Sequence, residues 1–196
     1  GEELPLLDCG ESGSTLRFLI PLALALRGGG RFVGRGRLME RPQEPYEKLF
    51  RSKDIFWEQK DGVLTVRGRL APGVYEIAGD VSSQFITGLL YALPLLEGES
   101  TLSLTTPLES RDYVSMTLEV LGDCGIQVYE TEGTFRIPGG QRYAPERPLT
   151  VEADWSGAAF WYAARLLGSE VEVQGMDLRS AQGDLRIVRF YEQLSQ

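Results

Sequence analysis

Two turns of small polar residues carry groups with which this chain could bind an anion. They are Gly10-Glu11-Ser12-Gly13-Ser14 and Ser82-Ser83-Gln84, and an apolar stretch of helical length follows each. The first N–H groups of a helix have no partner within that helix, and together with serine hydroxyls they suit a phosphate. N-capping by Ser14 and Ser82 is the structural alternative, because serine is a preferred N-cap residue.

A loop rich in glycine and arginine supplies a second candidate for anion binding. In residues 34–42, the fork-shaped guanidinium of Arg37 could hold a phosphate or a carboxylate with two hydrogen bonds. Arg41 directly follows Glu40, and we interpret these two residues as a structural ion pair. From Arg17 to Arg41 the chain has six arginines and one acidic residue, although its net charge is −8. That balance argues against a general nucleic-acid binder and suits a small anion held locally.

Composition excludes several other kinds of site. The 196 residues include no histidine, so Ser-His-Asp and Cys-His catalysis and histidine-based metal sites are ruled out. The two cysteines, Cys9 and Cys124, are too few for a disulfide scaffold, and a reducing compartment is the simpler setting. No apolar run reaches the ~20 residues that a membrane-spanning helix needs.

An internal repeat organises these turns. Asp8, Asp80 and Asp154 each end an apolar segment that has the pattern of a strand, and each is followed by small polar residues and an apolar helix. The aspartates lie 72 and 74 residues apart. In the third repeat the turn is Ser156-Gly157, which we interpret as a helix cap. The loop at 106–113 occupies the place in the second repeat that 34–42 has in the first.

The equivalence of the two loops extends to single residues. Ser110 and Tyr113 lie where Arg37 and Tyr46 lie in the first repeat. Two polar turns and two polar loops at matching positions favour one shared ligand site over four unrelated caps and loops.

Helices are predicted from hydrophobic periodicity. The first helix of each repeat is apolar on nearly every face, so we expect all three to be buried; they span 16–26, 85–96 and 158–167. Pro21 and Pro94 should kink or end the first two. The second helices are amphipathic and should lie at the periphery; they span 45–51, 113–121 and 185–194.

Strands are predicted between these helices. The segments 54–60 and 63–67 flank Asp61-Gly62, and 126–131 and 134–137 flank Glu132-Gly133; both dipeptides are hairpin turn signals. Residues 99–106 and 170–174 alternate as strands do. The fold class is therefore α/β (α+β), with repeated β-α-β-α-β-β units, buried helices and outer sheets. The units are 1–72, 73–147 and an incomplete 148–196, and we expect the chain to be a fragment of a longer protein.

Six ordered motifs resemble those of one enzyme family along essentially the whole chain. They are LDCGESGSTLR, GRGRLMERP, GDVSSQF, LESRDYVSMTL, VEADWSGAA and RSAQGD. The chain is similar to the central part of 5-enolpyruvylshikimate-3-phosphate synthases. The resemblance implies transfer of the carboxyvinyl group of phosphoenolpyruvate to the 5-hydroxyl of shikimate 3-phosphate, with release of phosphate, in the biosynthesis of chorismate and aromatic amino acids.

The resemblance also implies roles for the residues on the shikimate side. Ser82, Ser83 and Ser110 would bind the phosphate of shikimate 3-phosphate. Gln84 would lie between the two substrates, in contact with both, and Tyr113 would lie against the shikimate ring.

On the phosphoenolpyruvate side, the resemblance assigns Gly13 and Arg37. The backbone N–H of Gly13 would contact the phosphate, and Arg37 would pair with the same ligand. Ser14 replaces a usual threonine on the shikimate side and keeps its hydroxyl. Glu11 replaces a common asparagine and brings a negative charge close to the anion. The herbicide glyphosate, which occupies the phosphoenolpyruvate site in this family, would pack at Gly13.

The resemblance places this chain within a larger architecture. The family fold is an inside-out barrel of two globes, each built from three such units, and its substrates bind in the cleft between the globes. Residues 1–147 would belong to one globe and 148–196 would begin the other. The catalytic acid and base of the family lie outside these motifs, so none is assigned here, and we expect the isolated chain to be inactive.

Partners and alternatives follow from the same resemblance. It implies no cofactor and no metal, two small-molecule substrates, no nucleic acid, no membrane, a cytoplasmic location and a monomeric full-length protein. One alternative is a non-catalytic anion-binding module on the same fold. Another is the related transferase that acts on UDP-N-acetylglucosamine, but that enzyme has a reactive cysteine near the position of Arg37, and this loop has no cysteine.

Overall fold

The computed structural model describes residues 3–195 and divides the chain into two compact units. The first unit comprises Gly1–Glu146 and the second Arg147–Gln196. Each is described by itself below.

The first unit contains the β-α-β-α-β-β plan twice. The first copy consists of the following elements: β1 (Leu6–Asp8), α1 (Gly13–Arg27), β2 (Gly29–Val33), the 3₁₀ turn η1 (Leu38–Glu40), α2 (Glu44–Arg51), β3 (Phe56–Lys60) and β4 (Val63–Arg67). Its four strands form one sheet in the order β1-β2-β4-β3, with β1 and β2 parallel and the other pairs antiparallel.

The second copy repeats this order with little change. Its elements are β5 (Val74–Ile77), α3 (Ser83–Ala92), the 3₁₀ turn η2 (Leu93–Leu95), β6 (Ser100–Leu104), α4 (Arg111–Asp123), β7 (Tyr129–Thr131) and β8 (Thr134–Ile137). Its sheet has the order β5-β6-β8-β7, again with one parallel pair followed by antiparallel pairs. The two sheets share one topology, which confirms the predicted unit.

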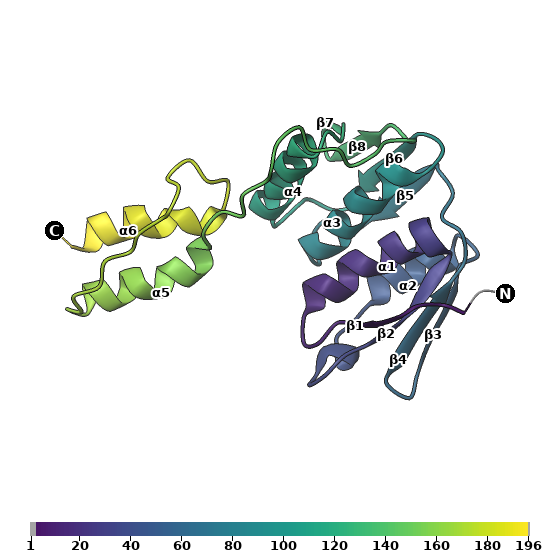
Figure 1. Cartoon of the computed structure of the whole chain (residues 1–196), viewed down its shortest axis with the longest axis horizontal. Helices are drawn as coiled ribbons and strands as arrows, with labels where there is room; N and C mark the ends of the chain where they lie inside the picture. The colour runs from purple at the N-terminus through teal and green to yellow at the C-terminus, as the bar shows by residue number, and fades with distance from the viewer. Residues whose placement is uncertain (1–2, 196) are drawn as a thin grey trace. The chain divides into compact units, whose positions relative to one another are not determined.

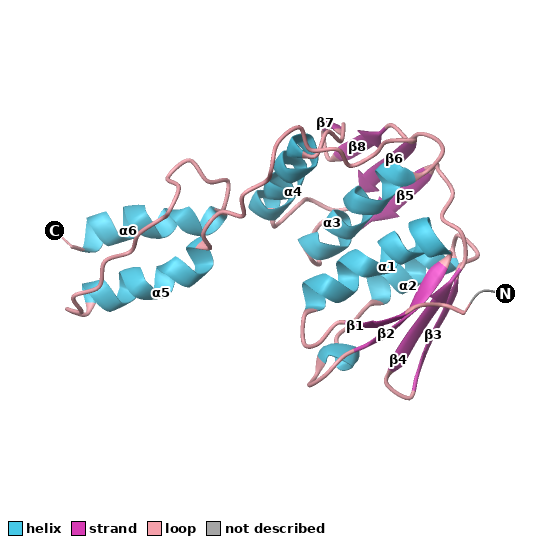
Figure 2. Ribbon diagram, viewed as in Figure 1, coloured by secondary structure: helices cyan, strands magenta, loops and turns pink. Residues whose placement is uncertain are grey.

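The apolar helices α1 and α3 lie between the two sheets and pack against each other (Figure 1; Figure 2). Along α3, every residue from Phe85 to Leu90 is buried, as expected of a helix with no polar face. In α1 the middle is buried at Leu16, Ile20 and Leu24, but Leu26 is 62% exposed. Burial of α1 therefore holds for one face and for its middle, not for its whole circumference.

The two prolines behave differently. The helix α1 continues through Pro21 to Arg27, so of the two effects predicted for this residue, a kink or an end of the helix, the end does not occur. Pro94 falls in the first turn of η2, after α3 has ended at Ala92. That position tolerates proline, because the first N–H groups of a helical turn need no partner within it.

Both predicted hairpins form. Asp61 and Gly62 have φ angles of 52° and 75°, and Glu132 and Gly133 have φ angles of 47° and 77°. Two consecutive residues with positive φ are the signature of a type I′ turn, which matches the twist of antiparallel strands. The strand β7 begins at Tyr129, three residues later than the predicted start of 126.

The second unit is built from helices and irregular segments. Its helices are α5 (Trp155–Leu166), the 3₁₀ turn η3 (Gly183–Leu185) and α6 (Arg186–Leu194). Within residues 147–195 no strand is formed, so the strands predicted at 170–174 and before Asp154 are absent. No hairpin in this unit is available to pair with them, and two isolated strands are at best marginally stable.

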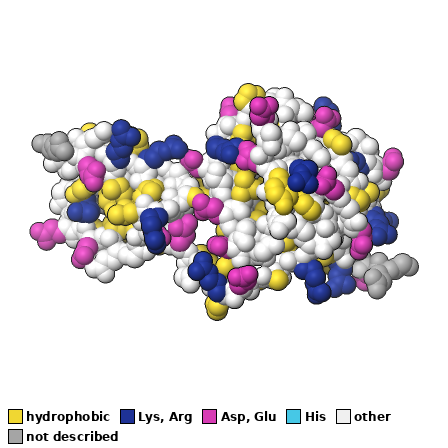
Figure 3. Space-filling model, turned by 90° about the horizontal axis from the view of Figure 1, so that it is seen from above, with side chains coloured by type: hydrophobic (Ala, Val, Ile, Leu, Met, Phe, Trp, Pro, Cys, Tyr) yellow, Lys and Arg dark blue, Asp and Glu magenta, His cyan; other side chains and the backbone are white. Residues whose placement is uncertain are grey.

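The prediction that α5 is buried is also wrong. Only Trp155 and Ala158 of this helix are buried, whereas Phe160 is 78% exposed. No sheet covers the helix within its own unit, and Figure 3 shows apolar side chains gathered on this unit.

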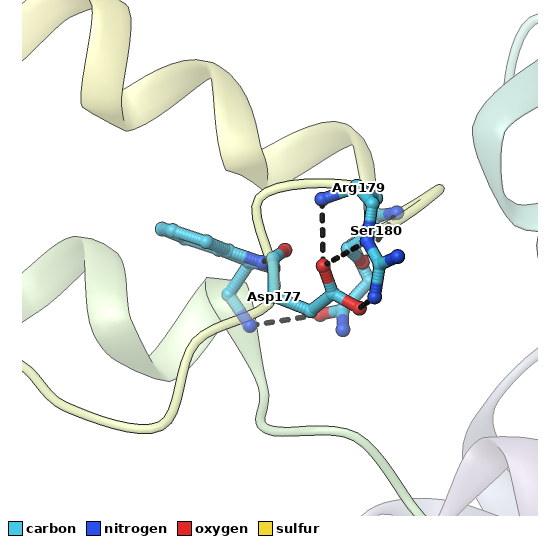
Figure 4. A network of polar contacts seen from close by, with 5 residues as sticks. Asp177, Arg179 and Ser180 are labelled. Carbon is cyan, nitrogen blue, oxygen red and sulfur yellow. Dashed lines mark hydrogen bonds and ion pairs between the residues drawn. The ribbon is translucent and has the colours of Figure 1, made fainter.

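A polar loop before η3 is tied to the start of α5 by hydrogen bonds. The Asp177 carboxylate accepts a hydrogen bond from the backbone N–H of Arg179 at 2.8 Å and pairs with the guanidinium of the same residue (Figure 4). The carbonyl of Asp177 accepts a hydrogen bond from the indole of Trp155, whose backbone N–H donates to Gln182. The RSAQGD motif therefore has a structural role in this unit. Among the residues described, no helix is long and apolar enough to span a membrane.

Candidate functional site

The start of α3 carries the first group of predicted ligand residues. Ser82 is the N-cap of this helix, and its hydroxyl oxygen accepts a hydrogen bond from the backbone N–H of Gln84 at 3.3 Å. Ser83 is buried in the first turn, and Gln84 is partly buried. Capping and ligand binding are compatible at Ser82, because a hydroxyl that accepts one hydrogen bond can still donate another.

The start of α1 has the same geometry with a different cap. The N-cap is Ser12, whose hydroxyl accepts from the backbone N–H of Thr15 at 3.1 Å, so the prediction that Ser14 caps this helix is wrong. Ser14 lies inside the first turn, with its hydroxyl 3.0 Å from that of Ser12. Gly13 is the first residue of the helix and is buried. In the third repeat the cap is Asp154, whose carboxylate accepts from the backbone N–H groups of Ser156 and Gly157, so the predicted cap at Ser156-Gly157 is wrong.

In both copies of the unit, one backbone hydrogen bond ties the two polar loops together. The N–H of Arg35 donates to the carbonyl of Gly10 in the first copy, at 2.6 Å. In the second, the N–H of Glu109 donates to the carbonyl of Gly79 at 3.3 Å. Each helix-start turn is therefore held against the loop that follows the next strand, as the repeat predicted.

The two helix starts meet at Gly13 and Gln84. A Cβ atom on Gly13 would lie 3.6 Å from the side-chain oxygen of Gln84 and 2.9 Å from Nη1 of Arg41. Glycine at this position thus leaves room for a guanidinium directly against the N-terminus of α1. In the described chain the side chain of Arg41 makes no ion pair, and its charge remains available to an anion.

Arg17 completes this cluster from the second turn of α1. Its Nη1 donates to the side-chain oxygen of Gln84 at 2.9 Å, and its guanidinium carbon lies 4.5 Å from the centre of the Phe85 ring. Burial is the main cause that lowers the pKa of Arg17, and the positive charge of Arg41 lowers it further. Two guanidinium groups therefore lie beside the adjoining helix starts. A cationic cluster next to free backbone N–H groups can bind an anion.

Arg37 is the N-cap residue of η1, the turn that also contains Glu40. Its side chain is 89% exposed and pairs with Glu40 at 3.3 Å, so the predicted ion pair of Glu40 with Arg41 is wrong. The spacing of the 3₁₀ turn explains the change, since residues three apart share one face of such a turn. An ion pair this exposed contributes little stability, and Arg37 can exchange Glu40 for a ligand. The Glu11 carboxylate lies against Gly36, beside this loop.

Ser110 and Tyr113 lie at the start of α4. Ser110 is the N-cap residue but makes no capping hydrogen bond through its side chain, and Tyr113 is 55% exposed. Among the residues that the structure describes, neither side chain forms a hydrogen bond with Gln84 or Gly13. The described structure thus brings Gly13 and Gln84 together, with Ser82 and Ser83 adjoining Gln84 in sequence, and no hydrogen bond joins Arg37, Ser110 or Tyr113 to them.

A groove of about 890 Å³ opens beside the start of α3. Arg17, Ser82 and Phe85 line one part of it, and its other charged residues are of both signs: Lys48, Lys53, Glu44 and Glu76. Gly13 and Gln84 do not line this groove. Ser82 therefore faces open space that a ligand could enter.

Comparison with known proteins identifies the family of this chain. The sequence profile of EPSP synthase (3-phosphoshikimate 1-carboxyvinyltransferase) matches residues 2–195. The chain belongs to the EPSP synthase family. The family resemblance seen in the six motifs is confirmed.

Curated members of the EPSP synthase family show how much of a whole protein the chain represents. The chain is 44% identical over 193 residues to a 3-phosphoshikimate 1-carboxyvinyltransferase of Clostridium kluyveri, covering 97% of this chain and 45% of that protein. It is 42% identical over 192 residues to the protein of the same name from Clostridium botulinum (strain Eklund 17B), covering 96% and 44%. The chain thus spans less than half the length of these relatives.

Solved structures support the fold of the family. EPSP synthase from Acinetobacter baumannii matches with a TM-score of 0.63 and 23% identity, covering 82% of this chain and 36% of that one. The enolpyruvyl transferase NikO from Streptomyces tendae matches with a TM-score of 0.58 and 16% identity, covering 80% and 37%. The mixed α/β fold class is confirmed, although the described residues form no closed barrel.

Sequence reasoning missed Arg17 and Arg41 as members of the site. Arg17 lies within an otherwise apolar helical segment, which predicts a residue of the core. Arg41 directly follows Glu40, which predicts an ion pair between them, but Glu40 pairs with Arg37. The available signal was the arginine-dense stretch that begins at Arg17 and ends at Arg41, because only one acidic residue in that stretch could neutralise them.

Proposed function

We propose that this chain forms the substrate-binding part of a 3-phosphoshikimate 1-carboxyvinyltransferase. The reaction transfers the carboxyvinyl group of phosphoenolpyruvate to the 5-hydroxyl of shikimate 3-phosphate and releases phosphate. The observation that carries the proposal is the meeting of the α1 and α3 starts, where Gly13, Gln84 and two guanidinium groups adjoin. Both substrates are phosphate esters, and this cluster combines the groups that recognise phosphate.

Within this function, the shikimate 3-phosphate side comprises Ser82, Ser83, Ser110 and Tyr113. The hydroxyls of the three serines donate to the phosphate oxygens, and Tyr113 offers an exposed aromatic face to the ring of the substrate. Ser14 adds a hydroxyl from the start of α1.

The phosphoenolpyruvate side comprises Gly13, Arg37 and Gln84. The N–H of Gly13 is free at the helix start, and Arg37 replaces its contact with Glu40 by a contact with the ligand. Gln84 lies where the two substrates adjoin, so it contacts both. We assign no general acid or base to this chain, because no carboxylate or lysine is placed within the Gly13–Gln84 cluster.

The larger organisation belongs to the same proposal. Residues 1–147 form two units of one globe, and 148–196 begin the second globe. The whole protein is a cytoplasmic monomer that uses neither a nucleic acid nor a membrane, and the cleft between its globes holds the substrates.

A chimera tests the function directly. This chain replaces the matching segment of the Clostridium kluyveri relative, and the purified protein is assayed for phosphate release from phosphoenolpyruvate with shikimate 3-phosphate. We expect turnover with shikimate 3-phosphate and none with UDP-N-acetylglucosamine. The isolated chain should show no turnover, because half of the cleft is missing.

The outcomes separate the three alternatives. A folded chimera that binds shikimate 3-phosphate without turnover would support the non-catalytic binding module. Turnover with UDP-N-acetylglucosamine would assign the chain to the related transferase. Turnover by the isolated chain would show that its own residues supply the proton-transfer groups.

A further inference from the structure

Arg17 connects three segments of the first unit through its three nitrogen atoms. Nη1 donates to the side-chain oxygen of Gln84 at 2.9 Å, Nη2 to the carbonyl of Pro42 at 3.2 Å, and Nε to the side-chain oxygen of Gln43 at 3.4 Å. The face of the guanidinium stacks on Phe85. Its orientation is therefore set by α1, by the loop after η1 and by α3 together.

This arrangement fixes which end of the Gln84 amide faces inward. A guanidinium only donates hydrogen bonds, so the atom that faces Arg17 must be the oxygen of the amide and not its nitrogen. The NH₂ group then points to the other side. Within the described chain this group makes no hydrogen bond, so both of its hydrogens remain available.

The direction of the amide matters for an anionic ligand. An NH₂ group attracts phosphate or carboxylate oxygens, whereas a carbonyl oxygen repels them. The two orientations of an unrestrained amide differ little in shape, so packing alone selects between them poorly. A fixed donor such as Arg17 makes one orientation much more favourable.

We propose that Arg17 is a positioning residue that locks Gln84 with its carbonyl oxygen inward and its NH₂ group toward the bound anion. The inference rests on the proposed function, because that function makes the ligands of Gln84 anionic. Each of the three nitrogens of Arg17 already donates one hydrogen bond to the protein, so the protein sets the orientation of the guanidinium; the bond to Gln84 is the shortest of the three, and within the described chain one N–H on each Nη remains unused. Arg41, whose side chain has no such contacts, is instead free to face the ligand.

A double-mutant cycle in the chimera tests this coupling. Arg17→Ala, Gln84→Ala and the double variant are compared by kcat and by KM for phosphoenolpyruvate. Each single variant should raise KM at least ~10-fold, as expected for loss of a hydrogen bond to a charged group. The double variant should be within about 3-fold of the worse single variant, because the two residues act as one unit.

Matched variants separate positioning from general structure. Arg27→Ala removes an exposed arginine at the far end of the same helix and should leave KM unchanged. Arg17→Lys keeps the charge but loses the fork, so it should give an intermediate KM and remain folded if Arg17→Ala does not. Multiplicative effects of Arg17→Ala and Gln84→Ala would overturn the proposal.

A second readout uses the isolated chain and needs no turnover. In the ¹⁵N-labelled chain, the side-chain NH₂ signals of Gln84 are assigned by their loss in Gln84→Ala. They should shift and broaden in Arg17→Lys and stay in place in Arg27→Ala. Unchanged Gln84 signals in Arg17→Lys would show that Arg17 does not orient the amide, even if the chimera is active. An inactive wild-type chimera with the expected NMR shifts would refute the proposed function and leave the orienting contact standing.

Discussion

At the scale of single residues, helix capping and ligand binding use the same atoms. Ser82 caps α3 and still has a hydroxyl hydrogen to donate, so the alternatives posed by the sequence are not exclusive. At α1 the two roles are divided between Ser12, which caps, and Gly13, whose missing side chain admits Arg41. The residue types were predictable from the turns. Which of these residues caps the helix and which one faces the ligand was not predictable, because it depends on which hydroxyl accepts from which backbone N–H.

The serines at the start of α3 give the first prediction. Substitution of Ser82→Ala and Ser83→Ala together in the chimera should weaken shikimate 3-phosphate binding at least ~10-fold, since each hydrogen bond to a charged group contributes about 1.5–3 kcal/mol. Isothermal titration calorimetry measures the affinity. Loss of the Ser82 cap should also lower the free energy of unfolding by about 1 kcal/mol. Circular dichroism therefore serves to check that the variant is still folded.

Ser103→Ala is the control, because this residue lies in β6 and outside the candidate site. Unchanged affinity in the double variant would leave Ser82 as a helix cap only and would exclude both serines from the phosphate site.

Arg37 gives the second prediction. Its exposed contact with Glu40 is weak and can be replaced by a two-pronged contact with a phosphate, which lysine cannot reproduce. Arg37→Lys in the chimera should therefore raise KM for phosphoenolpyruvate far more than KM for shikimate 3-phosphate. The exposed Arg69→Lys, in the loop between β4 and β5, serves as the control. Equal effects of Arg37→Lys on the two KM values would remove it from the phosphoenolpyruvate side.

At the scale of elements, repetition made most of the first unit predictable. The same order of strands and helices, with type I′ hairpins at matching places, follows from local patterns that the sequence shows twice. The contact between α1 and α3 could not be predicted, because both helices are apolar around most of their surface and periodicity did not indicate which faces meet.

Gly88 determines how closely those two helices approach. A Cβ atom there would lie 2.2 Å from the hydroxyl of Tyr46 and 2.5 Å from the carbonyl of Arg17, two atoms joined by a hydrogen bond of 3.0 Å. The glycine of α3 thus makes room for a buried tyrosine that bridges α1 and α3. Burial also raises the pKa of Tyr46 well above its usual value, so its hydroxyl stays protonated and able to donate.

The third prediction follows from this contact. Gly88→Ala should lower the free energy of unfolding of the chain by about 1–3 kcal/mol, because overpacking a close interface forces backbone or side-chain shifts. Gly122→Ala is the matched control: that helical glycine has open space around it, and alanine there should raise stability by about 0.5–1 kcal/mol. Chemical denaturation followed by circular dichroism measures both. An equal rise in the free energy of unfolding in both variants would contradict this prediction, because it would show that the α1–α3 contact accommodates a methyl group at Gly88 without cost.

At the scale of the whole molecule, the two units differ in how completely the sequence pattern is realised. In the first unit each parallel strand pair is extended by a hairpin, and the helices beneath are covered. In the second unit, residues 170–174 show the alternation of a strand but find no hairpin to extend a sheet, and α5 keeps Phe160 exposed. A strand pattern is therefore necessary for a strand but not sufficient, because the sheet is a property of all its members.

The central claim, that the adjoining starts of α1 and α3 bind shikimate 3-phosphate, is tested most directly by NMR. The ¹⁵N-labelled chain is titrated with shikimate 3-phosphate, and amide shifts are followed with Ser82→Ala/Ser83→Ala as the control. We predict saturable shifts at Ser14, at Ser82–Gln84 and at Ser110 and Tyr113 that disappear in the control, with no shifts in β3 and β4. Shifts that persist in the control, or that are absent from Ser82–Gln84, would contradict the site described here.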